Sequence, residues 1–532
     1  MRETVIKVKP EALLLILGLL TAFICGIPLY YLVLRAAEGG SETWELVFRV
    51  RTATILSRTL VLVFLVTFLS TLIGVLLAWV TVRCKLPFND LITVLLVIPL
   101  VVPSFVMATV LIEFFGTGGI LASWLGVLKI ASLPSVSGLS GATMTLIIVT
   151  YPYVFLSARS AMLRSDPSIE EVSRSLGFGR FNTFKLITLP MLKPSIASGA
   201  LLTALYTISD FGAVALMRYE TFTFAIFNQY ESTVNRSIVS GLSIVLVMFT
   251  LVLLITEGMT RSRFRYHGST SGSAYRVKRT LLGYWSGLVF ILTIIPITVG
   301  LFIPVGVLLW WLVRGLLTGQ SMTPLLQPSI NSLFVSITAA LLMVLVASPI
   351  AFLAAGHRNW WLIRIIERCT YIGFGLPGIV VAISLVFFGI NFARPVYQSV
   401  WLLLFGYIVL FIPVAVGSLK SSLLQVNPSF EEAARGLGAR SFRVLKSITV
   451  PLISPGIITT TVMVFLLSMK ELPATLVLSP IGFKTLSTVI WDSSVDAFFS
   501  KTAAASLLLI LVAGLPMAYM VIGNRSYENR QI

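Results

Sequence analysis

Apolar segments long enough to cross a lipid bilayer recur from one end of this chain to the other. Of the 532 residues, 57% are hydrophobic and only 11% are charged, whereas soluble domains carry about 25% charged residues. A helix needs about 20 mostly apolar residues to span a bilayer. The sequence therefore predicts an all-α integral membrane protein with about twelve transmembrane helices, near residues 12–34, 58–82, 91–115, 142–163, 195–217, 238–257, 282–312, 331–356, 371–392, 398–424, 456–478 and 503–524.

The first of these segments has charged residues before it, as a signal peptide does. Its apolar run from Leu13 to Leu34 is longer than the apolar core of a cleaved signal. We therefore expect it to remain as a membrane anchor.

The basic residues follow the membrane topology. The net charge of +18 would suit a polyanion such as nucleic acid, but the positions of the charges indicate orientation instead. If the amino terminus is cytoplasmic, most Lys and Arg residues fall in inward-facing loops, as in the stretches 159–193 and 420–446. The positive-inside rule describes this bias. We therefore expect a multi-pass protein with both termini in the cytoplasm and no nucleic-acid partner.

Cysteine and histidine are too few and too scattered for a metal centre. The three cysteines are Cys25, Cys84 and Cys369, and the two histidines are His267 and His357. Their spacing matches no zinc or disulfide pattern. We expect no tightly bound metal and no cofactor.

The chain contains an internal repeat. Residues 166–194 read DPSIEEVSRSLGFGRFNTFKLITLPMLKP and residues 427–455 read NPSFEEAARGLGARSFRVLKSITVPLISP, with 13 identities in 29 ungapped positions. Each copy lies between the fourth and fifth predicted spans of its half. Because each half has an even number of spans, the halves are predicted to be parallel six-helix repeats. We expect a first half at 1–258, a cytoplasmic linker at 259–280 rich in Ser, Gly, Arg and Lys, and a second half at 281–532.

Each repeated loop is predicted to form two short amphipathic helices joined at a glycine. Asp166 and Asn427 are typical N-caps, and each precedes a proline. Gly177 and Gly438 suit the left-handed position that ends a helix. Apolar residues lie at helical spacing between these points, namely Ile169, Val172 and Leu176 in one copy and Phe430, Ala433 and Leu437 in the other. Such a pair either docks on another protein or only caps its own bundle.

Both loops resemble the EAA motif of binding-protein-dependent ABC importer permeases. In the second copy Glu432-Ala433-Ala434 is followed by Gly438, and in the first Glu171-Val172-Ser173 is followed by Gly177. Because the first copy lacks both alanines, we expect its packing to be weaker. The resemblance implies that the loops couple to ATPase subunits through Glu171, Gly177, Phe181, Glu432, Ala433, Ala434, Gly438 and Phe442.

The same resemblance implies a fold, partners and a location. The fold would be that of a type I ABC importer permease, also called MetI-like, in a bacterial inner membrane. The partners would be two copies of a cytoplasmic ATPase and an extracytoplasmic solute-binding protein. The fused two-half layout, residues 469–491 and the segment Ser209 to Ala213 are similar to ferric iron permeases. Permeases for thiamine, polyamines, phosphonates and other small solutes share this architecture, so they stay open as alternatives.

Catalytic motifs are missing from the sequence. A phosphate-binding loop of the form GxxxxGK[ST] is absent, so ATP hydrolysis would have to come from separate subunits. We expect the chain not to be an enzyme. A secondary transporter with parallel repeats is the alternative from another class, but it would have nothing to dock on the two loops.

Acidic residues within the membrane are costly and indicate function by default. Asp210 and Glu471 occupy matching positions, about 15 residues after Pro194 and Pro455. We expect them, with Glu113 next in order, to line a path for a cation. The alternative is that each carboxylate caps a broken helix.

Overall fold

The computed structural model describes residues 12–127, 136–165, 167–232, 236–263, 284, 286–320, 324–357 and 360–530. These residues are helical with connecting turns, and none of them forms a strand. The chain packs as two compact units, which are described separately. Unit 1 comprises the chain up to Glu38 and residues Leu326–Thr485, and unit 2 comprises Gly39–Leu325 and Leu486 onward.

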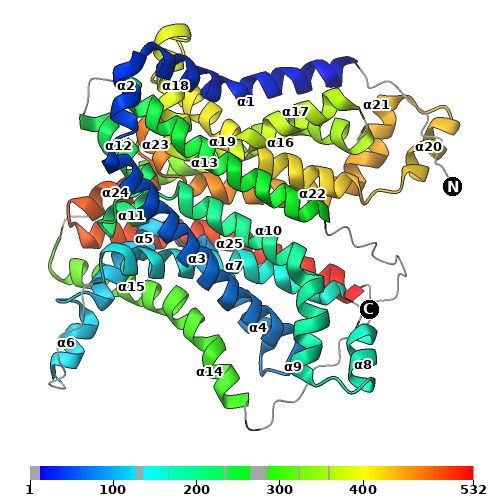
Figure 1. Cartoon of the computed structure of the whole chain (residues 1–532), viewed down its shortest axis with the longest axis horizontal. Helices are drawn as coiled ribbons and strands as arrows, with labels where there is room; N and C mark the ends of the chain where they lie inside the picture. Colours follow the sequence, from blue (N-terminus) through cyan, green and yellow to red (C-terminus); the bar gives the residue numbers. More distant parts are fainter. Residues whose placement is uncertain are drawn as a thin grey trace. The chain divides into compact units, whose positions relative to one another are not determined.

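Unit 1 joins the first helix of the chain to helices from its second half. Its helices, drawn in Figure 1, are α1 (Ala12–Glu38), α16 (Leu326–Gly356), α17 (Trp361–Tyr371), α18 (Gly378–Phe392), α19 (Val400–Leu423), α20 (Pro428–Gly436), α21 (Ser441–Val444), α22 (Val450–Met469) and α23 (Pro473–Leu478). The core consists largely of small and branched side chains, including Ala347 and Ala351 of α16, Ala415 and Val416 of α19, and Cys25 of α1. Small residues let helix backbones approach closely where lipid supplies no hydrophobic drive.

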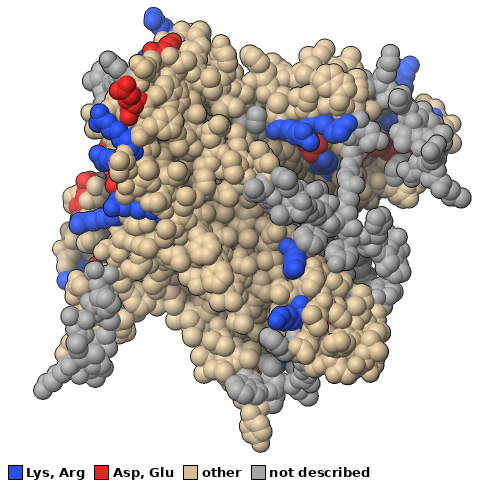
Figure 2. Space-filling view, in the orientation of Figure 1, with Lys and Arg blue, Asp and Glu red and all other residues tan. Residues whose placement is uncertain are grey.

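Unit 2 holds the remaining helices. They are α2 (Gly40–Val47), α3 (Val50–Arg83), α4 (Asn89–Leu95), α5 (Ser104–Phe115), α6 (Ile120–Val127), α7 (Gly138–Arg164), α8 (Pro167–Ser175), α9 (Arg180–Thr183), α10 (Leu189–Ser209), α11 (Gly212–Leu216), α12 (Phe222–Ser232), α13 (Arg236–Arg263), α14 (Ser286–Ile297), α15 (Ile303–Leu317), α24 (Leu486–Val495) and α25 (Phe499–Arg530). Helix α3 packs along α7, and α10 packs against both. The central part of α3 carries no charge between Arg58 and Arg83, and Figure 2 shows broad uncharged surface between a few groups of charged side chains.

The expected all-α membrane fold is confirmed. Among the described residues, eleven helices are long and apolar enough to cross a membrane. The predicted ninth span, 371–392, differs because Tyr371 ends α17 and the next α-helix is only Gly378–Phe392. Its 15 residues rise about 22 Å, less than the roughly 30 Å of hydrocarbon. A 3₁₀ turn, Ile372–Gly375, and Pro377 interrupt the helix before it.

The predicted third, fifth and eleventh spans are also broken. Pro103 stands between a 3₁₀ turn, Ile98–Val101, and α5. The fifth segment is α10 preceded by a π-helical turn, Phe184–Thr188, and it ends before Asp210. The eleventh is α22 preceded by the turn Leu445–Thr449, and it ends before Glu471. These breaks place the acidic candidates at helix ends.

The two units are assembled differently from the two expected sequence halves. Helix α1 of the first half belongs to unit 1, and α14, α15, α24 and α25 of the second half belong to unit 2. The expected linker, 259–280, lies mostly outside the described residues, and α13 extends to Arg263. The halves are therefore defined by the sequence repeat, whereas the units are defined by packing.

Candidate functional site

The repeated loops form the predicted pairs of short helices. In unit 2 the pair is α8 and α9, and in unit 1 it is α20 and α21. The side chain of Asn427 accepts a hydrogen bond from the backbone N–H of Ser429 at 3.1 Å, which confirms its role as N-cap. Asp166, the expected cap of the first copy, lies outside the described residues.

A left-handed glycine ends the first helix of each pair, as expected. Gly177 has φ +88° and Gly438 has φ +84°. The N–H of Phe178 donates to the carbonyl of Ser173 at 3.2 Å, and that of Gly177 donates to Arg174 at 3.0 Å. The second copy makes the same two bonds, with Ala439 donating to Ala434 and Gly438 to Arg435, both at 3.0 Å. This is the Schellman pattern, which turns the chain sharply after the helix.

The apolar stripe of each loop helix is exposed. Leu176 is 72% exposed and Leu437 is 90% exposed, and Ile169, Val172 and Phe430 are exposed as well. A stripe that served only to cap its own bundle would be buried against it. Within each unit, then, these helices present apolar surface that the unit itself does not cover.

The motif glutamates also point outward. Glu171, Glu432 and Ala433 are exposed, and Ala434 is half-buried. The backbones of Phe181 and Phe442 start α9 and α21, but their side chains lie outside what the structure describes.

The residues that anchor the loops were missed at the sequence level. They are the preceding glutamates, Glu170 and Glu431. Thr188 donates a hydrogen bond to Glu170 Oε1 at 2.9 Å, and Thr449 donates to Glu431 Oε1 at 2.7 Å. Both threonines are buried in the π-helical turn before the next long helix. The glutamate and the threonine are each identical in the two aligned copies, and this was the sequence signal for the anchor.

The anchor in unit 2 contains a further, largely buried ion pair. Arg83 Nη2 of α3 lies 2.7 Å from Glu170 Oε1, with the side chains only 8% and 13% exposed. Both copies also have an exposed ion pair one turn along the helix, Glu170 with Arg174 at 3.8 Å and Glu431 with Arg435 at 3.5 Å. The first loop is therefore also tied to α3 by charge.

The first copy compensates for the motif alanines that it lacks. Ser173 takes the place of Ala434 and is 3% exposed, and its hydroxyl lies 3.1 Å from that of Thr183. The position matching Thr183 is Val444, which is buried. A polar pair thus stands where the second copy has two apolar residues, and the weaker packing of the first copy stays a prediction.

Asp210 holds two helix ends in unit 2. Its Oδ1 accepts hydrogen bonds from the backbone N–H groups of Ala213 at 3.0 Å and Val214 at 3.4 Å, in the first turn of α11. Its Oδ2 accepts a bond from the hydroxyl of Ser104, the first residue of α5. A carboxylate is stabilised at helix N-termini because their N–H groups carry partial positive charge.

Glu471 plays the matching part in unit 1, with a longer side chain and a smaller neighbour. Its Oε1 accepts a bond from the N–H of Ala474 at 3.1 Å, near the start of α23. Gly378 follows Pro377 as Ser104 follows Pro103, and a Cβ added at Gly378 would lie 2.6 Å from Glu471 Oε1. One unit thus pairs aspartate with serine, and the other pairs glutamate with glycine.

The third acidic candidate lies elsewhere in unit 2. Glu113 is half-buried near the end of α5, where its carboxylate accepts a hydrogen bond from the indole N–H of Trp311 and lies near Arg314, both on α15. Asp210 belongs to unit 2 and Glu471 belongs to unit 1. Among the described residues, no group of three or more His, Cys, Asp or Glu side chains could hold a metal ion.

A bundle of membrane-crossing helices with two matched loops, each presenting an uncovered apolar helix, has the architecture of a transporter permease. The comparisons with known proteins identify the family. The chain belongs to the binding-protein-dependent transport system inner membrane component family, which matches twice, at residues 70–265 and 347–526. This double match confirms the two repeats, and a secondary transporter is no longer the competing class.

Similar curated proteins include permeases of several solutes. The chain is 32% identical to the Fe(3+)-transport system permease protein FbpB 2 of Haemophilus influenzae, over 96% of this chain and 98% of that protein. It is 23% identical to the ferric transport system permease protein FbpB of Actinobacillus pleuropneumoniae, over 86% of this chain and 69% of that protein. The sulfate transport system permease protein CysT of Escherichia coli is 25% identical, over 47% of this chain and 92% of that protein.

Proposed function

We propose that this chain is the complete membrane-spanning unit of an ATP-driven importer of ferric iron. The observation that carries the substrate is the 32% identity, over nearly the full length of both chains, to a permease named for Fe(3+) transport. The sulfate permease CysT matches only about half of this chain. Thiamine, polyamines and phosphonates remain the alternative substrates.

The two exposed loop helices are the proposed docking sites for two copies of a cytoplasmic ATPase. The stripes that include Leu176 and Leu437 are apolar and solvent-facing, with Glu171 and Glu432 also exposed on these helices. Residues that are apolar and uncovered mark interaction surfaces. The Schellman turns at Gly177 and Gly438 and the anchors at their bases give each helix a fixed orientation, which a mechanical coupling requires.

The proposed topology follows from these docking sites. Both loops must face the cytoplasm to reach an ATPase, and the basic residues around them agree with that side. Both termini would then be cytoplasmic. The opposite ends of the helices would receive a solute-binding protein, as the family description implies.

For Asp210 and Glu471 we propose a structural role first. Asp210 accepts three hydrogen bonds from the ends of α5 and α11, and Glu471 approaches the ends of α18 and α23. A carboxylate that is hydrogen-bonded to groups at helix ends attracts a passing cation less strongly. A guiding role for these residues and Glu113 is the alternative, and it requires the charge itself.

Uptake of radiolabelled ferric iron tests the substrate. Iron-limited cells lacking this chain should lose high-affinity ferric uptake and keep thiamine and polyamine uptake. Loss of another solute with normal iron uptake would refute the substrate and leave the class intact.

A pair of equally exposed leucine and isoleucine residues tests the docking sites. Leu437 and Ile481 are each 90% exposed in unit 1, so aspartate at either position should leave folding intact. Leu437→Asp should weaken association with the ATPase at least tenfold in a pull-down titration, and Ile481→Asp should not. Equal effects of the two substitutions would contradict docking through α20.

The purified chain alone should hydrolyse no ATP.

A further inference from the structure

Helix α10 of unit 2 carries hydroxyl groups on a side that is partly exposed. Five partly exposed residues lie on this side at helical spacing, and four of them bear a hydroxyl: Ser195, Ser198, Leu202, Tyr206 and Ser209. On α7, which packs along α10, Tyr153 and Ser157 are partly exposed as well. The rings of Tyr153 and Tyr206 lie 6.1 Å apart, and a Cβ added at Gly199 of α10 would lie 3.2 Å from Ser157 Oγ. We call the six hydroxyl-bearing residues of the two helices the hydroxyl face.

The serine hydroxyls of α10 on this face are accessible. Among the described residues, the hydroxyls of Ser195, Ser198 and Ser209 make no hydrogen bond, and none of the three is buried. The buried threonines of the same helix differ, because Thr207 donates to Thr203 O at 2.8 Å and Thr203 donates to a backbone carbonyl of α7 at 3.4 Å. The serine hydroxyls are therefore available to water or to a solute.

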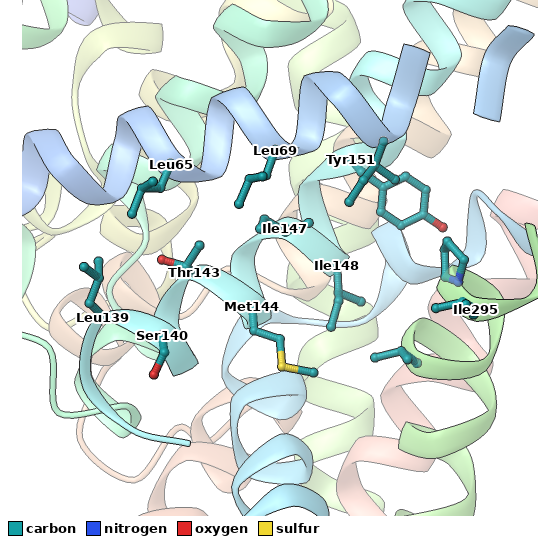
Figure 3. Close-up of a pocket in the computed structure, with 13 residues that line it drawn as sticks. Leu65, Leu69, Leu139, Ser140, Thr143, Met144, Ile147, Ile148, Tyr151 and Ile295 are labelled. Atoms are coloured by element: carbon teal, nitrogen blue, oxygen red, sulfur yellow. The ribbon is translucent and has the colours of Figure 1, made fainter. Parts of the chain in front are cut away.

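Other exposed surfaces of unit 2 suit lipid instead. The exposed positions in the central part of α3 are all apolar, and five of them recur every four residues: Leu60, Phe64, Phe68, Leu72 and Leu76. Figure 3 shows a side of α7 that faces α3 and α14, where most of the labelled residues are leucine or isoleucine. Tyr151 lies on that side, and Tyr153 lies about 200° further round the helix. A hydroxyl without a partner is unfavourable in hydrocarbon, so the hydroxyl face does not suit lipid.

The whole span that contains α10 is polar without being buried. Among the described residues, Phe184–Ser209 is the least hydrophobic of the eleven candidate spans, and Gly138–Leu163, which contains α7, is next. In the most apolar stretch of the α7 span 67% of the residues are buried, but in that of the α10 span only 22% are. Polar groups of a membrane helix that are not buried in protein face a water-filled space. We therefore expect α10 to border such a space.

Helix α10 is also continuous with the first repeated loop. Helix α9, the π-helical turn Phe184–Thr188 and α10 follow one another without a gap. Thr188 at the end of this turn bonds Glu170 of α8. A movement of the docked loop would thus reach the hydroxyl face directly, as a path that opens alternately to the two sides requires.

We propose that the hydroxyl face lines the solute path in unit 2 and that ferric iron passes it with its own oxygen ligands in place. This inference rests on the proposed function. Removing the ligands of a highly charged ion within a membrane is very costly. Neutral hydroxyls form hydrogen bonds with those ligands without replacing them, and weak contacts let the solute leave again. Asp210, whose oxygens are bonded to the ends of α5 and α11, does not ligate the metal in this arrangement.

The second repeat does not carry the same face. The matching positions of the second repeat are Gly456, Thr459, Met463, Leu467 and Lys470. Thr459 is the one residue of these five with a hydroxyl, and it donates to Pro455 O at 2.8 Å. We therefore assign the hydroxyl contacts to unit 2, and Thr459 supplies a matched control.

Cysteine accessibility tests whether the hydroxyl face meets water. The full chain, with Cys25, Cys84 and Cys369 replaced by alanine, receives one new cysteine, either Ser198→Cys or the control Phe68→Cys. The protein is reconstituted with its ATPase and binding protein. Ser198→Cys should react with a charged, water-soluble methanethiosulfonate at least ten times faster than Phe68→Cys, because a thiol must reach water to ionise and react. Equal rates would overturn the proposal.

Uptake of radiolabelled ferric iron into the same proteoliposomes tests contact with the solute. Ser198→Ala combined with Tyr206→Phe removes two hydroxyls and should lower uptake by a factor of about 5 to 100, the effect of two net hydrogen bonds. ATPase activity stimulated by the binding protein should not change, which separates lost contact from misfolding. Ser198→Thr, which keeps the hydroxyl, and the control Thr459→Ala should both transport normally. Unchanged uptake by the double variant would overturn the proposal.

One more variant tests whether the metal keeps its ligands. Ser198→Asp offers a carboxylate that can replace a ligand and hold the metal, so uptake should fall. Higher uptake would show that the metal passes by direct ligation, which would overturn this part of the proposal. The proposed function fails in a different way: if the wild-type chain takes up no iron while Ser198→Cys is accessible, ferric iron is refuted as the solute and the aqueous path is supported.

Discussion

The buried ion pair at the base of the first loop makes a quantitative prediction about the two repeats. Glu170→Gln should free α8 from its anchor far more than Glu431→Gln frees α20. Both glutamates occupy the same position of the repeat and bind a threonine at the same place. The two substitutions therefore remove the same bond to threonine, and they differ in the arginine that each leaves without a carboxylate.

The free-energy cost of each substitution follows from how deeply its ion pair is buried. Glu170→Gln leaves the guanidinium of Arg83 8% exposed and without its carboxylate, and breaking a buried pair in this way costs about 3–5 kcal/mol. The Arg435 partner of Glu431 is 55% exposed, so that pair contributes about 0–1 kcal/mol. Loss of the carboxylate bond from the threonine adds about 1.5–3 kcal/mol at most in either copy. The free-energy costs of the two substitutions therefore differ by about 2–5 kcal/mol.

Hydrogen exchange measures this difference directly. At 1.4 kcal/mol per factor of ten, amides of α8 should exchange about 30 to several thousand times faster, relative to α20, when each copy carries its own variant. The protein should be in a membrane mimetic and without its ATPase, so that docking does not protect either helix.

Two results would refute this reasoning. Equal acceleration in the two loops would show that Arg83 does not depend on Glu170. A double-mutant cycle with Arg83→Met gives the second test, because removing both partners of a buried pair is often nearly neutral. If the α8 amides exchange as fast in the double variant as in Glu170→Gln alone, the free-energy cost of Glu170→Gln does not come from an unpaired charge on Arg83.

Three further predictions concern glycines and carboxylates. Gly438→Val should cost about 1–3 kcal/mol, because a β-branched residue is strained at φ +84°, and should reduce ATPase association, whereas Gly436→Val within α20 should not; normal association with Gly438→Val would contradict this. Asp210→Asn keeps a hydrogen-bonding oxygen, so a structural role predicts that transport persists, and loss of transport with ATPase binding intact would favour cation guidance. Gly378→Ser alone should collide with Glu471 and lower thermal stability, and Glu471→Asp should rescue it; a stable single variant would refute the clash.

Local features of the fold could be predicted from the sequence, because local rules determine them. The length of the apolar runs predicted the membrane helices, and the repeated pattern predicted the short helices and glycine turns of both loops and the N-cap Asn427. Gly177 and Gly438 were predicted in the left-handed region and are found there. These outcomes depend on a few neighbouring residues, so no knowledge of distant contacts was needed.

Contacts between distant segments could not be predicted. The motif glutamates Glu171 and Glu432 are exposed, whereas Glu170 and Glu431 face the bundle. One step along a helix rotates a side chain by about 100°, so the choice between adjacent glutamates depends on where the next long helix lies. The pairing of Gly378 with Glu471 was likewise invisible, because a glycine gives no sign of the side chain that occupies its space.

The composition of unit 1 has a consequence for how the chain is made. Helix α1 is synthesised before the helices it packs against, α16, α17 and α18, which begin about 290 residues later. At about 5–20 residues per second, synthesis keeps α1 waiting roughly 15–60 s. During that time Cys25 and Leu32, which are fully buried in the finished protein, lack the neighbours from α16, α17 and α18. Helix α1 thus has to persist in the membrane without the helices that bury it until the second repeat has been made.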